Sequence, residues 1–154
     1  MTTTVARIVL APREGQVLEG LADGSTLATV SLDLKIREGT AMGYLKLAKR
    51  KLHGVSETAA ALAVGYATDA ISPPNLLPPE ALFLPREQRD IVSLIARGMA
   101  ATQMATDLKR PVSDVRRDGR ELLANLRAQN RAHVVTRAWQ FQILTADEVN
   151  AWLR

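Results

Sequence analysis

The chain has 154 residues, a formal net charge of +4 and a sequence pI near 9.8, and it contains no cysteine. The lack of cysteine excludes disulfides and thiolate metal sites, while the positive charge favours a polyanionic partner. No apolar run is long enough to cross a bilayer, and residues 1–4 lack the charged start and apolar stretch of a secretion signal, so we expect a cytoplasmic protein without a membrane partner.

The sequence contains an internal repeat. Residues 10–52 align without a gap with residues 84–126, which lie 74 positions later. The matched pairs include Leu10 and Leu84, Gly24 and Gly98, the tripeptides 33–35 and 107–109, and apolar pairs such as Val17 and Ile91. A duplicated segment of this size either presents one binding surface twice or packs against its own copy. We therefore predict two small domains, the first unit (residues 8–70) and the second unit (residues 84–143).

Helical periodicity dominates the first unit. In chain order we predict a helix opened by Pro12-Arg13-Glu14 and ended by Gly24, a short helix capped by Thr26, a tight turn at 35–37, a helix over 38–52, and a helix capped by Ser56 that reaches about Ala67. The apolar residues of these segments recur at helical spacing, so each helix has one face directed at a common core.

The second unit predicts the same order, with helices over 86–97, 101–108, 111–128 and 130–141. Residues 71–83 join the two units, and four prolines between 72 and 79 predict a stiff, extended connector that is not helical. The tail, residues 144–154, predicts a short helix that Thr145 caps and Trp152 docks.

A short helix, a tight turn and a longer helix with outward basic residues form the helix-turn-helix pattern. The segments Leu10-Ala11-Pro12-Arg13-Glu14, Val17-Leu18 and Leu21-Ala22-Asp23-Gly24, followed by residues 26–52, resemble the C-terminal DNA-binding domain of LuxR-type regulators (the LuxR/FixJ/GerE class). The second unit matches through Leu84, Ile91-Val92, Leu94-Ile95-Ala96-Arg97-Gly98, Leu108, Val115 and Leu126. Region 4 of sigma factors has a similar layout. The resemblance implies an all-α protein with two four-helix helix-turn-helix domains in tandem, in which the third helix of each domain reads DNA.

The resemblance also selects candidate DNA-binding residues. In the second unit they are Ser113, Arg116, Arg117 and Arg120, and in the first unit they are Thr26, Thr40, Lys46, Lys49 and Arg50. Arginine side chains can donate two parallel hydrogen bonds to guanine or to phosphate. The first unit has Gly39, Met42 and Gly43 early in the third helix, so we expect the second unit to supply most of the base discrimination. A solvated helix face is the alternative interpretation of the lysines and arginine at 46–51.

Two features of the third helices oppose the interpretation that they bind DNA. Asp114 and Asp118 are expected to temper the positive charge of the second unit, although a carboxylate is favourable near a helix N-terminus. Gly43 and Gly119 each cost about 1 kcal/mol within a helix relative to alanine. They therefore indicate either close packing against a partner or a poorly formed helix.

These observations predict a regulator of transcription that binds double-stranded DNA as a covalent pseudo-dimer. No enzymatic activity is expected because no nucleophile is paired with a base, and no cofactor is implied. No metal is expected either, since His53 and His133 lack carboxylates at ligand spacing. The alternative is a protein-interaction adaptor that binds RNA polymerase or another regulator, with vestigial DNA binding in one or both domains.

Overall fold

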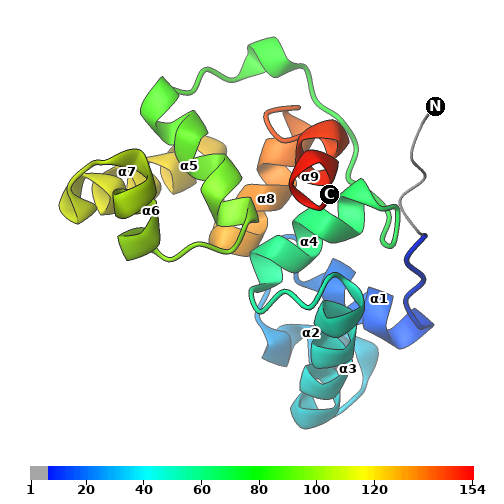
Figure 1. Cartoon of the computed structure of the whole chain (residues 1–154). Helices are drawn as coiled ribbons and strands as arrows, with labels where there is room; N and C mark the ends of the chain where they lie inside the picture. Colours follow the sequence, from blue (N-terminus) through cyan, green and yellow to red (C-terminus); the bar gives the residue numbers. More distant parts are fainter. Residues whose placement is uncertain (1–6) are drawn as a thin grey trace.

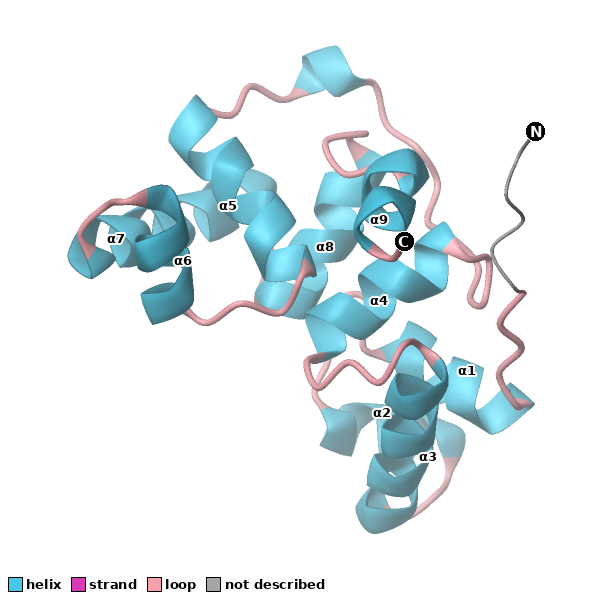
Figure 2. Cartoon of the chain, in the orientation of Figure 1, coloured by secondary structure: helices cyan, strands magenta, loops and turns pink. Residues whose placement is uncertain are grey.

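The computed structural model describes residues 7–154, and within this range the chain is all-helical, with no strand (Figure 2). The all-α prediction is therefore confirmed. The elements are α1 (Pro12–Gly20), α2 (Leu27–Leu34), α3 (Glu38–Lys51), α4 (Thr58–Ala67), the 3-10 helix η1 (Pro79–Ala81), α5 (Arg86–Ala96), α6 (Ala101–Leu108), α7 (Val112–Leu126), α8 (Arg131–Gln140) and α9 (Ala146–Trp152).

The repeat in the sequence corresponds to a repeat in the backbone. Helices α2 and α6 begin and end 74 positions apart, and α1 and α3 begin 74 positions before α5 and α7. The turn after the short helix is also shared, because Lys35 (φ 57°) and Lys109 (φ 54°) both adopt the left-handed conformation. Gly98 (φ 80°) adopts it directly after the C-cap of α5, and Gly24 (φ 87°) adopts it in the turn after α1, which ends at Gly20 and not at Gly24 as expected; glycine has no steric cost in this conformation.

Most of the predicted helix starts are confirmed. The side chains of Thr26, Asn130 and Thr145 each accept a hydrogen bond from a backbone N–H in the first turn of α2, α8 and α9. The prediction for Ser56 is wrong: α4 begins at Thr58 with Glu57 in the capping position, and no side chain caps it. Ser56 lies one residue too early for its hydroxyl to serve as the cap.

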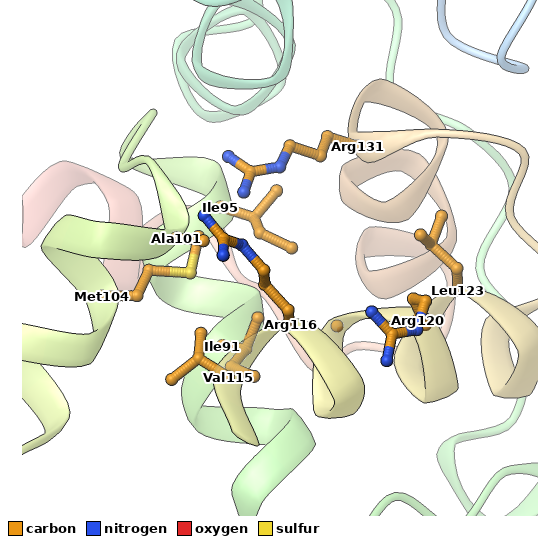
Figure 3. A pocket seen from close by; sticks show the side chains of 10 residues that line it. Ile91, Ile95, Ala101, Met104, Val115, Arg116, Arg120, Leu123 and Arg131 are labelled. Carbon is orange, nitrogen blue, oxygen red and sulfur yellow. The ribbon is translucent and has the colours of Figure 1, made fainter. Parts of the chain in front are cut away.

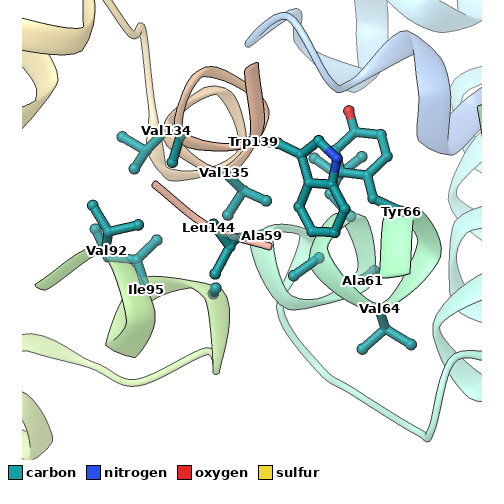
Figure 4. Packing of buried hydrophobic residues seen from close by; sticks show 14 of the residues in the cluster. Ala59, Ala61, Val64, Tyr66, Val92, Ile95, Val134, Val135, Trp139 and Leu144 are labelled. Atoms are coloured by element: carbon teal, nitrogen blue, oxygen red, sulfur yellow. The ribbon is translucent and has the colours of Figure 1, made fainter. Parts of the chain in front are cut away.

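The two units pack against each other through α4 and α8 (Figure 1). Every residue from Ala59 to Tyr66 is buried, because α4 also contacts α1, α3, α5 and α9. At the contact with α8, the Tyr66 hydroxyl and Thr136 Oγ1 are 2.9 Å apart, and the rings of Tyr66 and Trp139 have centroids 5.4 Å apart (Figure 4). The apolar side chains of both units consequently form one continuous core.

The connector is mostly extended, as predicted, but it contains the single helical turn η1, which corrects the expectation that it has no helix. Pro79 opens this turn, at the position where a proline lacks only an N–H that would be unpaired anyway. The connector is tied to the end of α8, since Leu77 N–H donates to the Gln140 carbonyl (2.7 Å). Phe83, in contrast, is 83% exposed.

The C-terminal helix α9 packs on α4 and joins the two units further. Ser93 on α5 donates to a carboxylate oxygen of Glu148 (2.6 Å), and the Arg97 guanidinium lies 5.4 Å from the centroid of the Trp152 ring. Trp152 therefore docks α9, as predicted. Within residues 7–154, no helix combines the length and apolar character needed to span a bilayer.

The α4–α8 contact predicts a large effect of removing Trp139. Replacing this buried ring by alanine removes its contact with Tyr66 and leaves a cavity, so Trp139→Ala should lower the free energy of unfolding by about 3–5 kcal/mol. Urea denaturation followed by circular dichroism measures this change. Phe83→Ala, which removes an exposed ring, is the control and should change stability little. Equal effects of the two substitutions would contradict the packing described above.

Candidate nucleic-acid interface

Helix α7 is held against the second unit by apolar and ionic contacts. Val115, Leu122 and Leu126 are buried on its inner face. The buried Asp118 joins them and accepts a hydrogen bond from Arg110 Nη2 at 2.5 Å, which fixes α7 to the turn that follows α6. The hydrogen bond with Asp118 raises the pKa of the Arg110 guanidinium above its ordinary value, although desolvation opposes this. These inward side chains therefore hold α7 in place within the second unit.

The four predicted residues of α7 lie together on the opposite face. Ser113, Arg116, Arg117 and Arg120 are all exposed. At 100° per residue they span an arc of roughly 100°, centred opposite Val115 and Leu122. An α-helix presenting a polar and cationic arc of this width has the dimensions of elements that enter the DNA major groove.

The carboxylate of Asp118 pairs with Arg110, and it also tempers the charge of the α7 face at Arg117, as expected. Asp114 and Asp118 do constrain one neighbour: Arg117 Nη1 lies 3.6 Å from Asp114 Oδ1, and Arg117 Nε lies 3.7 Å from Asp118 Oδ1. Arg116 and Arg120 have no carboxylate oxygen within 4 Å among the described residues. These two guanidinium groups are the least compensated charges of the α7 face.

Only two of the cations predicted on α3 share its outward face. Lys46 and Arg50 are exposed there. Lys49 is half-buried and turned aside, where desolvation lowers its pKa although the nearby Glu57 raises it. Lys51 donates to Glu14 Oε1 on α1 (2.7 Å). The structure therefore separates Lys49 from the two cations with which the sequence groups it.

The two predicted threonines of the first unit are both exposed, but neither lies at the centre of the α3 face. Thr26 caps α2, and its hydroxyl lies 3.2 Å from Thr29 N and 3.0 Å from Thr29 Oγ1. Gly39 lies on the same side of α3 as Lys46 and Arg50, and Thr40 is directed about 100° away from that side. Both hydroxyls can at most contact a ligand from the edge of this face.

The outward faces of α3 and α7 differ in chemistry at equivalent positions. Where α7 has Arg116 and Arg117, α3 has Met42 and Gly43. Met42 is 42% exposed and Leu47 is 41% exposed, while Leu32 on the adjacent α2 is 77% exposed. Reasoning from the sequence missed Leu32 and Leu47. Alignment of the two units could have identified them, because Thr106 and Glu121 occupy the equivalent positions.

Known proteins offer no independent indication of what these faces bind, since no family model, no curated protein and no solved structure matches the chain. Across residues 7–154, no three His, Asp or Glu side chains are grouped so that they could hold a metal ion. The geometry and charge of the α3 and α7 faces are therefore the only indications of what these faces bind within the described residues.

The glycines of α3 and α7 lie in continuous helices, so the expectation of a poorly formed helix is wrong. A Cβ at Gly43 would meet no atom within 4 Å outside its own helix backbone and chain neighbours. Gly43→Ala should therefore raise the free energy of unfolding by about 0.5–1 kcal/mol, through helix propensity alone.

Gly20→Ala is the control for Gly43→Ala, because it adds the same methyl group at a helix position that has no room for it. Its new Cβ would lie 2.9 Å from a methyl carbon of Val30, closer than packed carbon atoms approach, so this substitution should destabilise the protein. Thermal melts of both variants measure the two shifts. A loss of stability in Gly43→Ala would mean that a partner already packs on this face in solution.

Proposed function

We propose that this protein is a DNA-binding regulator of transcription whose two LuxR-type helix-turn-helix domains act as a covalent pseudo-dimer on duplex DNA. The observation that carries the proposal is the exposed α7 face formed by Ser113, Arg116, Arg117 and Arg120. The short helix α6 and a tight turn precede α7, which is the order found in proteins whose second helix enters the major groove.

The α7 face suits base recognition. Arg116 and Arg120 each carry a planar fork of donors that can bond guanine O6 and N7 or two phosphate oxygens. Ser113 lies in the first turn of α7, where its hydroxyl can bond a phosphate or a base edge. Because Asp118 is bound by Arg110, its carboxylate does not repel the phosphate backbone from this face.

The α3 face suits a supporting role on the same duplex. Lys46 and Arg50 can bond phosphates, which fixes position without reading sequence. Because α4 packs against α8, the separation of α3 and α7 is set by the core, and the two units would meet two unequal half-sites. This role is non-enzymatic, requires no cofactor, and belongs in the cytoplasm.

A second candidate function is favoured by the exposed apolar side chains Leu32, Met42 and Leu47. Large apolar side chains exposed on neighbouring helices are typical of protein-interaction surfaces. In this alternative the first unit is an adaptor that binds RNA polymerase or another regulator, and its DNA binding is vestigial. A stable protein complex combined with weak affinity for any duplex would favour the adaptor.

The affinity for duplex DNA should depend strongly on salt. Each phosphate that is neutralised releases counterions, so the logarithm of the association constant should fall with the logarithm of salt concentration by about 0.9 per phosphate contact. Fluorescence anisotropy with a duplex selected from random sequences measures the slope. An affinity that stays constant between low and moderate salt would exclude the DNA-binding proposal.

The two units should contribute differently to recognition. Arg116→Ala and Arg117→Ala should each cost about 1–3 kcal/mol on the preferred site and relax its sequence preference, whereas Lys46→Ala should weaken binding equally on all sequences. Affinities and footprints on selected and scrambled duplexes separate the two effects. Arg154→Ala is the charge-matched control, because it removes one positive charge after α9, away from α3 and α7 (Figure 1).

The opposite pattern would reverse the assignment of the two units. If the arginine variants keep full specificity while Met42→Ala, which removes an exposed side chain of α3, abolishes it, the first unit reads the bases. If Arg154→Ala weakens binding as much as Lys46→Ala, only overall charge matters, and the α3 face makes no defined phosphate contact.

A further inference from the structure

A pocket opens beside α7, on the flank of the proposed DNA-reading face. It has a volume of about 220 Å³ and lies where α5, α6, α7 and the start of α8 converge (Figure 3). Its floor is apolar and includes Ile91, Ile95, Met104 and Leu123. Gly119 of α7 forms part of its wall, and a Cβ added there would meet no atom within 4 Å outside its own helix backbone and chain neighbours.

The first unit provides an internal comparison for this pocket. Leu45 is the equivalent of Gly119, and its side chain is 5% exposed and belongs to the core. Leu27, the equivalent of the pocket residue Ala101, also packs against the core. The same fold thus places leucine side chains where the second unit has glycine and alanine. The cavity follows from these two small residues and is not a general property of the fold.

Retaining Gly119 is unfavourable for the isolated domain. Glycine is among the least favourable residues within a helix, and an unfilled apolar cavity forfeits packing contacts. Leucine at the equivalent position shows that a large side chain is compatible with this backbone. The space beside Gly119 is therefore open and apolar, and a ligand can occupy it.

The rim of the pocket is cationic, again in contrast to the first unit. Arg116, Arg120 and Arg131 line it; the equivalents of the first two are Met42 and Lys46, and the helix that corresponds to α8 begins with Thr58 where α8 begins with Arg131. In Figure 3 the side chains of Arg116 from α7 and Arg131 from α8 both extend toward the region near Ile95, whereas Arg120 lies beside Leu123. Arg131 Nη1 donates to the Met99 carbonyl (2.6 Å).

No carboxylate lies within 4 Å of these three guanidinium groups in the part of the chain that the structure describes. An anion at the mouth can accept charge-assisted hydrogen bonds from Arg116 and Arg131, whose side chains extend toward the same region. The rim therefore lacks the negative charge that a bound anion would supply.

We propose that this pocket binds a small organic anion with an apolar body. The apolar body occupies the space beside Gly119, over Ile91, Ile95 and Met104, and the anionic group binds Arg116 and Arg131 at the mouth. A DNA phosphate alone would leave the apolar floor unused, so the pocket fits a separate small molecule better than the duplex backbone.

One consequence rests on the proposed function. Arg116 and Arg120 belong both to the pocket and to the α7 face, so an anion in the pocket would compete with DNA. The site itself does not depend on DNA binding, and its primary test uses the protein without DNA.

The test uses the full chain and phenyl phosphate as the probe, with inorganic phosphate and phenol as comparison ligands, by isothermal titration calorimetry. Phenyl phosphate should bind at least about tenfold more tightly than either, because only it satisfies both the guanidinium rim and the apolar floor. Equal affinity for inorganic phosphate would mean a charged surface only, and equal affinity for phenol would mean an apolar cavity only. Either result, or no binding of phenyl phosphate at millimolar concentration, overturns the proposal.

Gly119→Leu is the decisive variant, since it places in α7 the residue that the first unit has. It should keep the helical circular dichroism spectrum and lose at least about tenfold in affinity for phenyl phosphate, whose space the new side chain fills. Gly15→Leu is the matched control: it also adds leucine to a helix where no outside atom lies within 4 Å, and it should bind as the unmodified chain does. Unchanged affinity in Gly119→Leu overturns the proposal.

Arg131→Gln keeps the test independent of the pocket volume and of the α7 face. It should reduce affinity for phenyl phosphate about tenfold by removing one charge-assisted contact, and unchanged affinity would overturn the assignment of the rim. DNA affinity is measured separately. If phenyl phosphate binds as expected but no duplex does, the pocket stands and the proposed function fails; if duplex binds and phenyl phosphate does not, the reverse holds.

Discussion

The contact between α4 and α8 joins the two units into one body, and the positions of the other helices depend on it. Helix α4 is rich in alanine and buried on every side, so five other helices can approach its backbone closely, and Tyr66 and Trp139 fill the space where α8 crosses it. Two units of this size would each bury only a small core if they folded apart. Sharing α4 gives them one core. It also means that the spacing of α3 and α7 is set by packed side chains, with the proline-rich connector as a tether to the end of α8.

A shared core allowed the outward faces of the two units to diverge. Most buried positions are apolar in both units, as the pairs Val17 and Ile91 or Leu52 and Leu126 demonstrate. The exposed positions changed freely because they contribute little to stability. One difference lies further inward: the second unit has the ion pair of Arg110 and Asp118 where the first has Ile36 and Tyr44, which both pack against the core. Either charge alone would be partly buried without a partner, so the two residues of the pair depend on each other.

The sequence predicted the local structure well and the tertiary contacts poorly. Helix starts and the left-handed turns follow from capping side chains, glycine and the repeat, all of which act over a few residues. The inward direction of Asp118 depends on Arg110, eight positions away in another element, and the burial of Lys49 depends on its environment beside α4. Hydrophobic periodicity could not predict the packing of α4 on α8, because α4 is apolar on every face and no single face stands out. The pocket was missed because an absent side chain leaves no signal unless the two units are compared.

That comparison also indicates where function is concentrated. Natural sequences agree with their fold at nearly every level, and the exceptions gather at sites that do something other than fold. In α7 the exceptions are a glycine within a helix, a cavity where a leucine would fit, and arginines without counter-charges. All of them occur on one side of one helix, and at the equivalent positions α3 has leucine, methionine and lysine. Both units therefore carry a glycine within the third helix, but in the described part of the chain only α7 has an open pocket beside its glycine and arginines at the pocket rim, and α5, α6 and α8 of the second unit hold α7 in place.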